Sequence, residues 1–207
     1  MLKTLLISLA CAVVLSPSLA VAQTPAPAGT TVRLRGNIEA IDADTVTVAV
    51  NDGQHIKLVL PADIKVTTFA RIALADIKAG DYVGSAAVRG PNGRLRALEV
   101  HVFPEALRGT GDGQRPWDLG TESSMTNGAV DGVAGIVDGR TLKIAYKGGT
   151  AEVDVGVATP VVLWVPNGDK SVLKAGAAVI VGARKAPDGT YTTTSIQAEK
   201  DGVKPPL

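Results

Sequence analysis

The sequence has 207 residues, 21 basic and 20 acidic side chains, a formal net charge of +1, and few aromatic residues (two Trp, three Tyr and two Phe). A chain so close to neutral has no charge excess to attract nucleic acid or an anionic lipid surface. Its length suits one domain or two small ones.

The first 22 residues have the three parts of a secretory signal peptide. Lys3 supplies the positive start, an apolar run extends from Leu5 to Leu15, and Ala20-Val21-Ala22 is a small-x-small cleavage site. The run is shorter than the roughly 20 apolar residues that a transmembrane helix needs. Cys11 lies inside this run, and the large residue before it stands one position too late for a lipoprotein signal. We therefore predict cleavage between Ala22 and Gln23 and a periplasmic or secreted bacterial protein.

Cleavage at this point changes which chemistry is open to the mature chain. It removes Cys11, the only cysteine, together with Lys3, the only charged side chain of the leader. The mature chain then has equal numbers of basic and acidic side chains. Disulfides, thiolate nucleophiles and cysteine metal ligands are excluded. Nothing after residue 22 is apolar for long enough to span a membrane as a helix.

Alternating apolar and polar residues dominate the chain after a short flexible tether at residues 23–30. The runs Thr45–Val50 and Ile56–Leu60 both have the period of two that is typical of a half-buried strand. Asn51-Asp52-Gly53 lies between them, and an Asp-Gly pair in this position predicts a β-hairpin because glycine adopts the positive φ of the turn.

A second hairpin follows the same logic. Val83–Val88 leads into Gly90-Pro91-Asn92-Gly93, and the chain returns as a strand over Leu95–Val100. Signals for helices are nearly absent, and Leu74–Lys78 suits a single turn.

The second half of the chain repeats the order of the first. Three separate elements recur with one offset of 96 residues: Thr45–Val48 as Thr141–Ile144, Lys78–Gly80 as Lys174–Gly176, and Pro91–Gly93 as Pro187–Gly189. The segment Gly36–Ile41 recurs as Gly128–Val133 with an offset of 92, which places a four-residue insertion near Ala134–Gly139. The chain is therefore predicted to be a duplication.

We predict an all-β protein made of two tandem small OB-like β-barrels. The predicted units are a signal peptide at 1–22, a tether at 23–30, a first barrel at 31–102, a connector at 103–127, a second barrel at 128–199 and a tail at 200–207. A copy this small buries little core by itself, so closure into a barrel and packing against its twin both help. An open two-sheet sandwich is the alternative for each copy.

Two sets of segments carry a resemblance to known proteins. Residues 36–50, 75–83 and the Pro-Asn-Gly hairpin resemble a bacterial domain with an OB-like barrel that is common in exported proteins. The segment Glu99–Gly111, continued by Arg115–Leu119 and Ser124–Asn127, resembles a group of exported proteobacterial proteins of unknown function that are often labelled "metal ABC transporter permease". The resemblance implies export and small barrels, and it supplies no activity and no site residues. The label conflicts with this sequence, because a permease needs several transmembrane helices.

The connector is the longest stretch without a counterpart in the repeat. Together with His101, which lies two residues before it, the connector collects the side chains that form our candidate ligand or partner surface: His101, Glu105, Arg108, Asp112, Arg115, Trp117 and Asp118. A loop of this length inside a compact chain is usually functional or disordered, and its aromatic residues favour order. We expect it to pack across both barrels with Trp117 as a buried anchor.

A metal site is one hypothesis for this surface. His101 would bind the ion together with Glu105, Asp112 and Asp118. The mature chain offers His55 as its one other histidine and no cysteine, and a zinc or copper site made mainly of carboxylates is uncommon. The alternative is that His101 ends a strand and that the acids pair with the arginines of the connector.

Other hypotheses have weaker support in the sequence. The glycine-rich segment Arg108–Gly113 resembles an anion-binding loop, but no helix pattern follows it. The mature serines lie in no nucleophile-elbow context, and His101 lacks a serine partner. Nucleic-acid binding by an OB-like barrel needs a basic groove with exposed aromatic residues. The charge of this chain is balanced and its aromatic residues are few.

The sequence therefore favours a non-catalytic periplasmic binding or scaffold protein, without a cofactor, that acts on an envelope component or a protein partner. The alternatives are a periplasmic metal-binding accessory protein and a hydrolase of unknown type.

Overall fold

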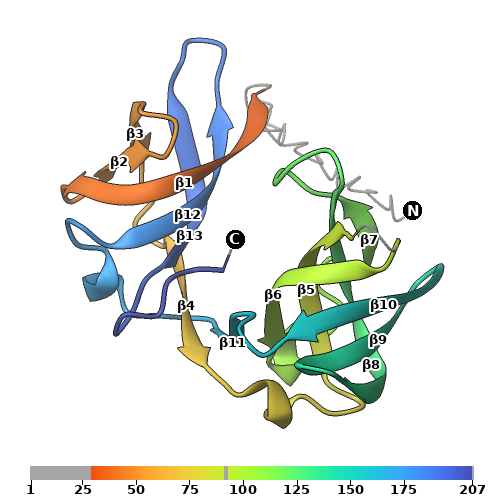
Figure 1. The fold of residues 1–207 in the computed structure, drawn as a ribbon. Coiled ribbons are helices and arrows are strands. Elements are labelled where there is room, and N and C mark those ends of the chain that lie inside the picture. Colours follow the sequence, from red (N-terminus) through yellow and green to blue (C-terminus); the bar gives the residue numbers. More distant parts are fainter. Residues whose placement is uncertain (1–28, 91–92, 207) are drawn as a thin grey trace, which may run out of the picture.

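The computed structural model describes residues 29–90 and 93–206, and this part of the chain is all-β, as predicted (Figure 1). Its strands are β1 (Thr30–Ile41), β2 (Thr45–Val50), β3 (His55–Val59), β4 (Lys65–Arg71), β5 (Tyr82–Arg89), β6 (Leu95–Phe103), β7 (Gly113–Pro116), β8 (Ser123–Ile136), β9 (Gly139–Tyr146), β10 (Gly149–Gly156), β11 (Val161–Val165), β12 (Ala178–Lys185) and β13 (Tyr191–Ala198). Short 3-10 turns occur at η1 (Leu74–Asp76), η2 (Glu105–Leu107) and η3 (Lys170–Val172). The predicted signal peptide and residues 23–28 of the tether lie outside the described residues.

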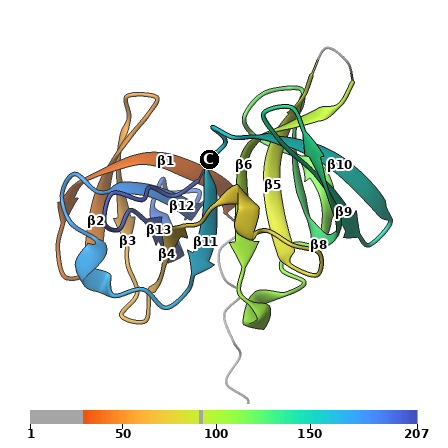
Figure 2. The ribbon, with the colours of Figure 1, turned by 60° about the horizontal axis from the view of Figure 1, so that its bottom comes forward.

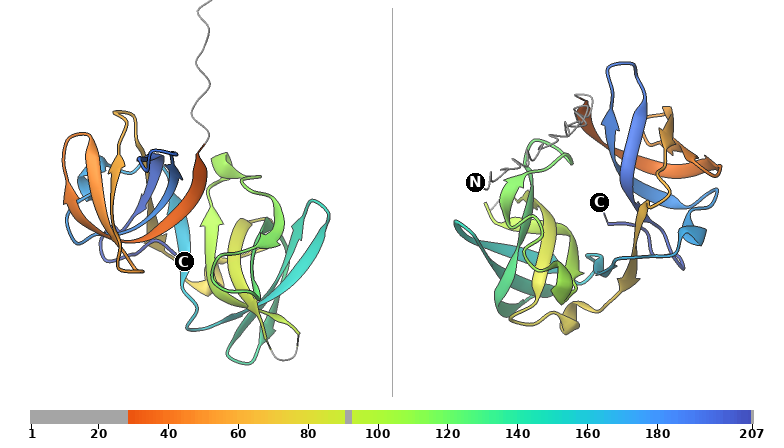
Figure 3. Two further views of the ribbon diagram at one scale, coloured as in Figure 1. Left: turned by 90° about the horizontal axis from the view of Figure 1, so that it is seen from above. Right: turned by 180° about the vertical axis from the view of Figure 1, so that it is seen from behind.

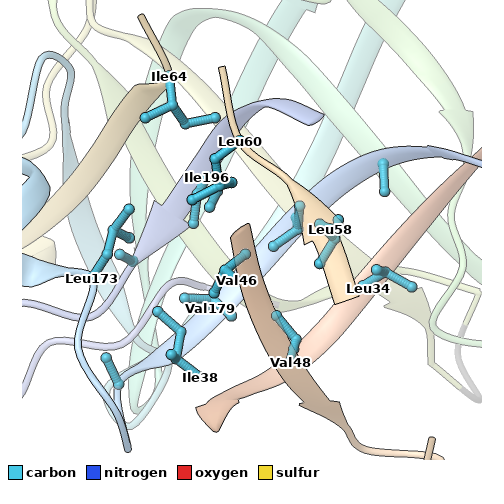
Figure 4. Close-up of a cluster of buried hydrophobic side chains, with 14 of the residues drawn as sticks. Leu34, Ile38, Val46, Val48, Leu58, Leu60, Ile64, Leu173, Val179 and Ile196 are labelled. Carbon is cyan, nitrogen blue, oxygen red and sulfur yellow. The ribbon is translucent and has the colours of Figure 1, made fainter. Parts of the chain in front are cut away.

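Five strands close into a ring that we call barrel A (Figure 2). β1 is antiparallel to both β2 and β12, β2 is antiparallel to β3, and β12 is antiparallel to β13. A short parallel pairing of β13 with β3 closes the ring. The alternating apolar residues of these strands fill its interior, including Val46, Leu58 and Val179 (Figure 4). The predicted hairpin at Asn51–Gly53 joins β2 to β3, with Gly53 at a φ of 87°.

A second ring, barrel B, has the same plan. β8 is antiparallel to β5 and β9, β9 is antiparallel to β10, and β5 is antiparallel to β6. A parallel pairing of β10 with β6 closes it. Its core includes Val83, Val100, Leu142 and Val153. The closed barrel, and not the open sandwich, is therefore the architecture of both units.

Two strands lie between the barrels and join them. Residues Lys65–Thr67 of β4 pair in parallel with β13 of barrel A, and the rest of β4 pairs antiparallel with β11. Strand β11 in turn pairs in parallel with β6 of barrel B. Figures 1 and 3 show β4 carrying the chain from one barrel to the other. The two barrels therefore belong to one continuous hydrogen-bonded sheet.

Each barrel is built from both halves of the chain, which corrects the predicted domain boundaries. Barrel A takes β1–β3 from the first half and β12–β13 from the second, and barrel B takes β5–β6 from the first half and β8–β10 from the second. Neither of the predicted repeat ranges, 31–102 and 128–199, closes a barrel by itself. The reason is that β4 is extended and leaves barrel A instead of folding back onto it. Its counterpart β11 leaves barrel B in the same way and carries the second half into barrel A.

Matching details on both sides support the repeat. β1 has a bulge between Ile38 and Ala40 and β8 has one between Val130 and Gly132, which correspond at the offset of 92. The recurring glycines show directly that the two halves of the chain exchange strands between the barrels. Gly80 N donates to Val130 O, whereas Gly176 N donates to Ile38 O, both at 2.8 Å. Each glycine thus bonds to the strand of the opposite half. The predicted insertion near Ala134–Gly139 covers the end of β8, the turn and the start of β9.

An approximate two-fold axis passes between β4 and β11. Val66 lies opposite Ile196 and Val161 lies opposite Val100, so β4 and β11 occupy equivalent places. On this alignment Phe69 is the counterpart of Trp164, and these two residues face each other in the antiparallel ladder. Their rings meet edge to face with centroids 5.6 Å apart. The outer faces of the two barrels consequently face each other across this axis.

No helix within 29–90 or 93–206 has the length and apolar character needed to cross a membrane.

Candidate functional site

The connector is ordered and contacts both barrels, as expected. β7 pairs with β8 along the edge of barrel B. The next two residues reach barrel A, where Asp118 accepts hydrogen bonds from both terminal nitrogens of Arg35 at 2.8 and 2.9 Å. The guanidinium carbon of Arg33 lies 3.9 Å from the centre of the Trp117 ring. We predicted that Trp117 would be fully buried, but it is only partly buried. One face of its ring is covered by Arg33 instead of by apolar core.

A pocket of about 170 Å³ lies between the barrels, and we call it the inter-barrel pocket. Its walls include His101 of β6, Asn127 of β8, Gln197 of β13 and, from the connector, Arg115 and Trp117. An aromatic wall is formed by Trp164 stacked on Phe103, with centroids 5.1 Å apart. Pro206 near the C-terminus also lines it, and Figure 3 shows the C-terminus between the two barrels.

A buried acid–histidine pair borders this pocket. Glu99 and His101 are two residues apart on β6 and therefore point to the same face, with exposed fractions of 1% and 5%. His101 Nδ1 lies 3.0 Å from Glu99 Oε2, and Ala86 N donates to Glu99 Oε1 at 3.0 Å. The pair fixes Nδ1 of the imidazole. His101 Nε2 has no hydrogen-bond partner among the described residues.

Gly84 makes room for this arrangement. It lies between His101 and Asn127 on the neighbouring strands. A Cβ atom on Gly84 would lie 2.1 Å from His101 Nε2 and 2.7 Å from Asn127 Oδ1, so any larger residue would displace one of the two side chains. Close approach of His101 and Asn127 therefore requires glycine here.

Two buried polar atoms of pocket residues lack a protein partner in the described structure. Asn127 donates through Nδ2 to Thr110 O at 3.0 Å, which leaves its Oδ1 as a buried acceptor without a donor. The Trp117 Nε1–H is a buried donor without an acceptor. Nearly all buried polar groups in folded proteins are hydrogen-bonded, so each of these atoms calls for a specific explanation.

Several residues in or beside the pocket have counterparts across the two-fold axis, but the paired side chains differ. With the offsets of the repeat, Glu99 corresponds to Ser195 and His101 to Gln197, while Gly84 corresponds to Ile180. Asn127 likewise corresponds to Arg35. One side of the pocket therefore has the acid–histidine pair, and the other side has arginine and amide groups.

The remaining predicted residues attach the connector to barrel B. Arg108 Nε donates to Glu105 Oε1 at 2.6 Å, and Arg108 Nη2 donates to Gly80 O. Asp112 accepts from the backbone N–H of Lys147 at 2.7 Å and from the Tyr82 hydroxyl at 3.4 Å. Of the seven candidates, His101, Arg115 and Trp117 line the pocket, Asp118 lies beside it, and Glu105, Arg108 and Asp112 do not.

The geometry does not support two of the hypotheses for the connector, the metal site and the anion-binding loop. The carboxylates of Glu105, Asp112 and Asp118 have separate partners away from His101, and in the described part of the chain no group of three His, Cys, Asp or Glu residues is placed to hold a metal ion. In the glycine-rich segment, the carbonyl oxygens of Thr110 and Gly111 accept hydrogen bonds from Asn127 and Arg115. Carbonyl groups in this position do not make an anion-binding loop.

Sequence reasoning missed Glu99, Gly84 and Asn127. The signal for Glu99 was its spacing of two from His101 in a largely apolar strand, which puts both side chains on one face. Comparison of the repeats would have added a second signal, since Ser195 and Gln197 stand at the equivalent positions.

Tyr82 provides a pH test of how the connector packs. Burial and the nearby Asp112 carboxylate together raise the pKa of Tyr82 to about 12, against the lowering effect of Arg108. The folded pKa lies above the ordinary value of 10.0, so this contribution to stability is complete below pH 10 and is lost between pH 10 and about 12. At pH 11 the loss is about 1.4 kcal/mol.

Urea unfolding of the wild type and Tyr82→Phe at pH 8 and pH 11 measures this term. The variant cannot ionise at this position, so the wild type is expected to lose about 1.4 kcal/mol more than the variant between the two pH values. An equal loss in both proteins would show that the hydroxyl is not held in its protonated form.

Comparisons with protein-family models, with curated proteins and with solved structures gave no match to this chain.

Proposed function

We propose that this chain is a non-catalytic binding protein of the bacterial periplasm, or a secreted one, that holds a chemical group of an envelope component or protein partner in the inter-barrel pocket. Export is supported by the signal-peptide pattern of residues 1–22. The closed five-stranded rings support the description of the barrels as OB-like. They also support the expected kinship with exported barrel proteins.

One observation carries the proposal: buried polar atoms without partners belong to the walls of an aromatic pocket. Asn127 Oδ1 and Trp117 Nε1 are an acceptor and a donor that a folded protein rarely leaves unused. Ligand pockets typically combine apolar and aromatic walls with a few placed polar groups. They also occur preferentially at interfaces between domains, which is where this pocket lies.

The test uses three small aromatic probes that differ in charge: benzoate, benzyl alcohol and benzylamine. Saturation-transfer NMR would be recorded on the mature protein, on Gln197→Trp and on Thr194→Trp. Gln197 lines the pocket, so a tryptophan there is expected to fill it and to abolish probe binding. Thr194 is an exposed residue of the same strand, so the same side chain there is expected to leave binding unchanged. Equal binding to all three proteins, or binding to none, would contradict the proposal.

The Glu99–His101 pair favours a second candidate, a hydrolase. A carboxylate that fixes Nδ1 leaves Nε2 of the imidazole as a base toward a cavity, which is the arrangement of a general base. Against it, none of the described hydroxyl groups hydrogen-bonds to His101. Turnover of an ester or amide that is lost in His101→Gln, with ligand binding retained, would establish this function in place of the first.

A further inference from the structure

The charge around the inter-barrel pocket is unbalanced on the side of the connector. Arg33 and Arg35 share a single carboxylate, that of Asp118, at 3.2 and 2.8 Å. Arg115 forms no ion pair with any described residue, and its Nη1 donates to the carbonyl of Gly111. Partial burial, and then the nearby Arg33, lower the pKa of Arg115. Within the described part of the chain, three guanidinium groups with one carboxylate leave an excess of positive charge beside the pocket.

Glu99 does not neutralise this excess. Its carboxylate is held by His101 and by the backbone N–H of Ala86 on the far side of the imidazole ring. It is almost completely buried, with an exposed fraction of 1%. The carboxylate next to His101 is thus already in use within barrel B.

A free donor lies next to the unpaired cation. The guanidinium carbon of Arg115 is 5.4 Å from the centre of the Trp117 ring, and the Nε1–H of that ring is the buried donor without an acceptor. A carboxylate can accept from two donors at once, and its bonds to a guanidinium are stronger than bonds between neutral groups. One carboxylate would satisfy both groups.

The rest of the pocket fits a flat apolar body. Phe103 and Trp164 form the aromatic wall, and Met125 and Ile180 are buried apolar residues of the lining. An apolar cavity of about 150 Å³ holds one benzene molecule. The pocket, at about 170 Å³, therefore has room for one ring with a small substituent.

We infer that the inter-barrel pocket binds a small organic carboxylate, with its anionic group against Arg115 and the indole N–H of Trp117 and its apolar body against Phe103 and Trp164. This inference rests on the proposed binding function and adds the chemical class of the ligand. It also gives Arg115 a role in specificity, because Arg115 separates anions from neutral molecules of the same shape.

The experiment is a calorimetric or NMR titration of benzoate, benzyl alcohol and benzylamine into the mature protein, Arg115→Gln and Arg89→Gln. Benzoate is expected to bind at least about tenfold more tightly than the alcohol, which corresponds to about 1.4 kcal/mol, and the amine is expected to bind most weakly. Arg115→Gln should reduce benzoate to the affinity of the alcohol. Arg89 lies outside this pocket and donates to Gly93 O, so Arg89→Gln removes the same charge without changing binding.

The outcomes separate the carboxylate inference from the proposed binding function. If the alcohol or the amine binds as well as benzoate, or if Arg115→Gln has no effect, the carboxylate inference fails, while loss of binding in Gln197→Trp would keep the pocket as the site. If no probe binds the wild type, both claims fail. Should Arg115→Gln not fold, Arg115→Lys keeps the charge without the planar fork, and its benzoate affinity is expected to lie between those of the wild type and the alcohol level.

Discussion

Cutting the connector is expected to leave the protein in one piece. A protease site inserted between Gly120 and Thr121 lies in an exposed turn ahead of β8, and cleavage there separates β1–β7 from β8–β13. Each barrel contains strands from both fragments, so the fragments share the long pairings of β1 with β12 and of β5 with β8. They also share the apolar cores of both barrels. Dissociation would expose both cores at once, so the cut protein should not dissociate without denaturant.

Native mass spectrometry of the cut protein measures this result. We expect one particle with the mass of the whole chain, which separates into two fragments only after denaturation. Two smaller folded particles would instead show that each half forms its own barrel. The wild-type protein, which lacks the inserted site, is treated with the same protease as the control for loss of material.

Removal of the buried carboxylate of Glu99 is expected to be the most damaging single truncation at the site. Glu99→Ala leaves the N–H of Ala86 and the Nδ1 of His101 without partners in a buried place, and it also opens a cavity. Truncation of one member of a buried pair of this kind costs on the order of 3–5 kcal/mol of unfolding free energy. Glu99→Gln keeps an acceptor for Ala86 and a donor for a neutral imidazole, so its cost should be about 1 kcal/mol.

The repeat provides the matched control for this series. Ser195 occupies the equivalent place on β13 but is exposed, so Ser195→Ala should change the unfolding free energy by less than about 0.5 kcal/mol. Urea unfolding of the three variants measures the series. A Glu99→Ala protein as stable as Ser195→Ala would mean that the acid–histidine pair contributes nothing to the fold.

The strands, the hairpins and the duplication were predictable because they depend on local patterns. The alternation around Val46 and Val48 and the glycine of the turn at Gly53 act within one hairpin, whatever lies beyond it. The exchange of strands was not predictable in this way. Because β5 and β12 have similar patterns, β1 can pair with either by local criteria, and the choice depends on whether β4 runs straight or folds back.

The candidate site was predicted in part for the same reason. The connector was identifiable as the unrepeated segment, and three of the seven candidate residues do meet at the pocket. The metal hypothesis assumed that His101 and the connector acids lie together because they are close in sequence. In the structure β6 turns His101 toward Gly84 and Asn127, while the acids follow the connector along the outside of barrel B. Only the register of β5, β6 and β8 decides that His101 lies apart from the connector acids.

Strand exchange explains how a duplicated chain obtains an asymmetric pocket. The two-fold axis brings equivalent positions face to face, as with His101 and Gln197. Once the halves belong to one chain, each position can change without changing its twin. The side with Gly84 has gained a buried acid–histidine pair, and the side with Ile180 has arginines. The inter-barrel pocket therefore depends on the exchange.

Disulfide trapping between β1 and its partner tests this exchange most directly. A protein beginning at Gln23 contains no cysteine, so a single bridge can be introduced. Thr30 faces Lys185 on β12, and both side chains are exposed. The position equivalent to Lys185 in the first half is Arg89 on β5, which would face Thr30 if each half closed its own barrel. Facing residues of an antiparallel pair are close enough for a disulfide. We expect rapid oxidation of Thr30→Cys with Lys185→Cys and none of Thr30→Cys with Arg89→Cys, read from thiol titration and non-reducing peptide maps. A bridge between positions 30 and 89 instead would contradict the exchange and the pocket built on it.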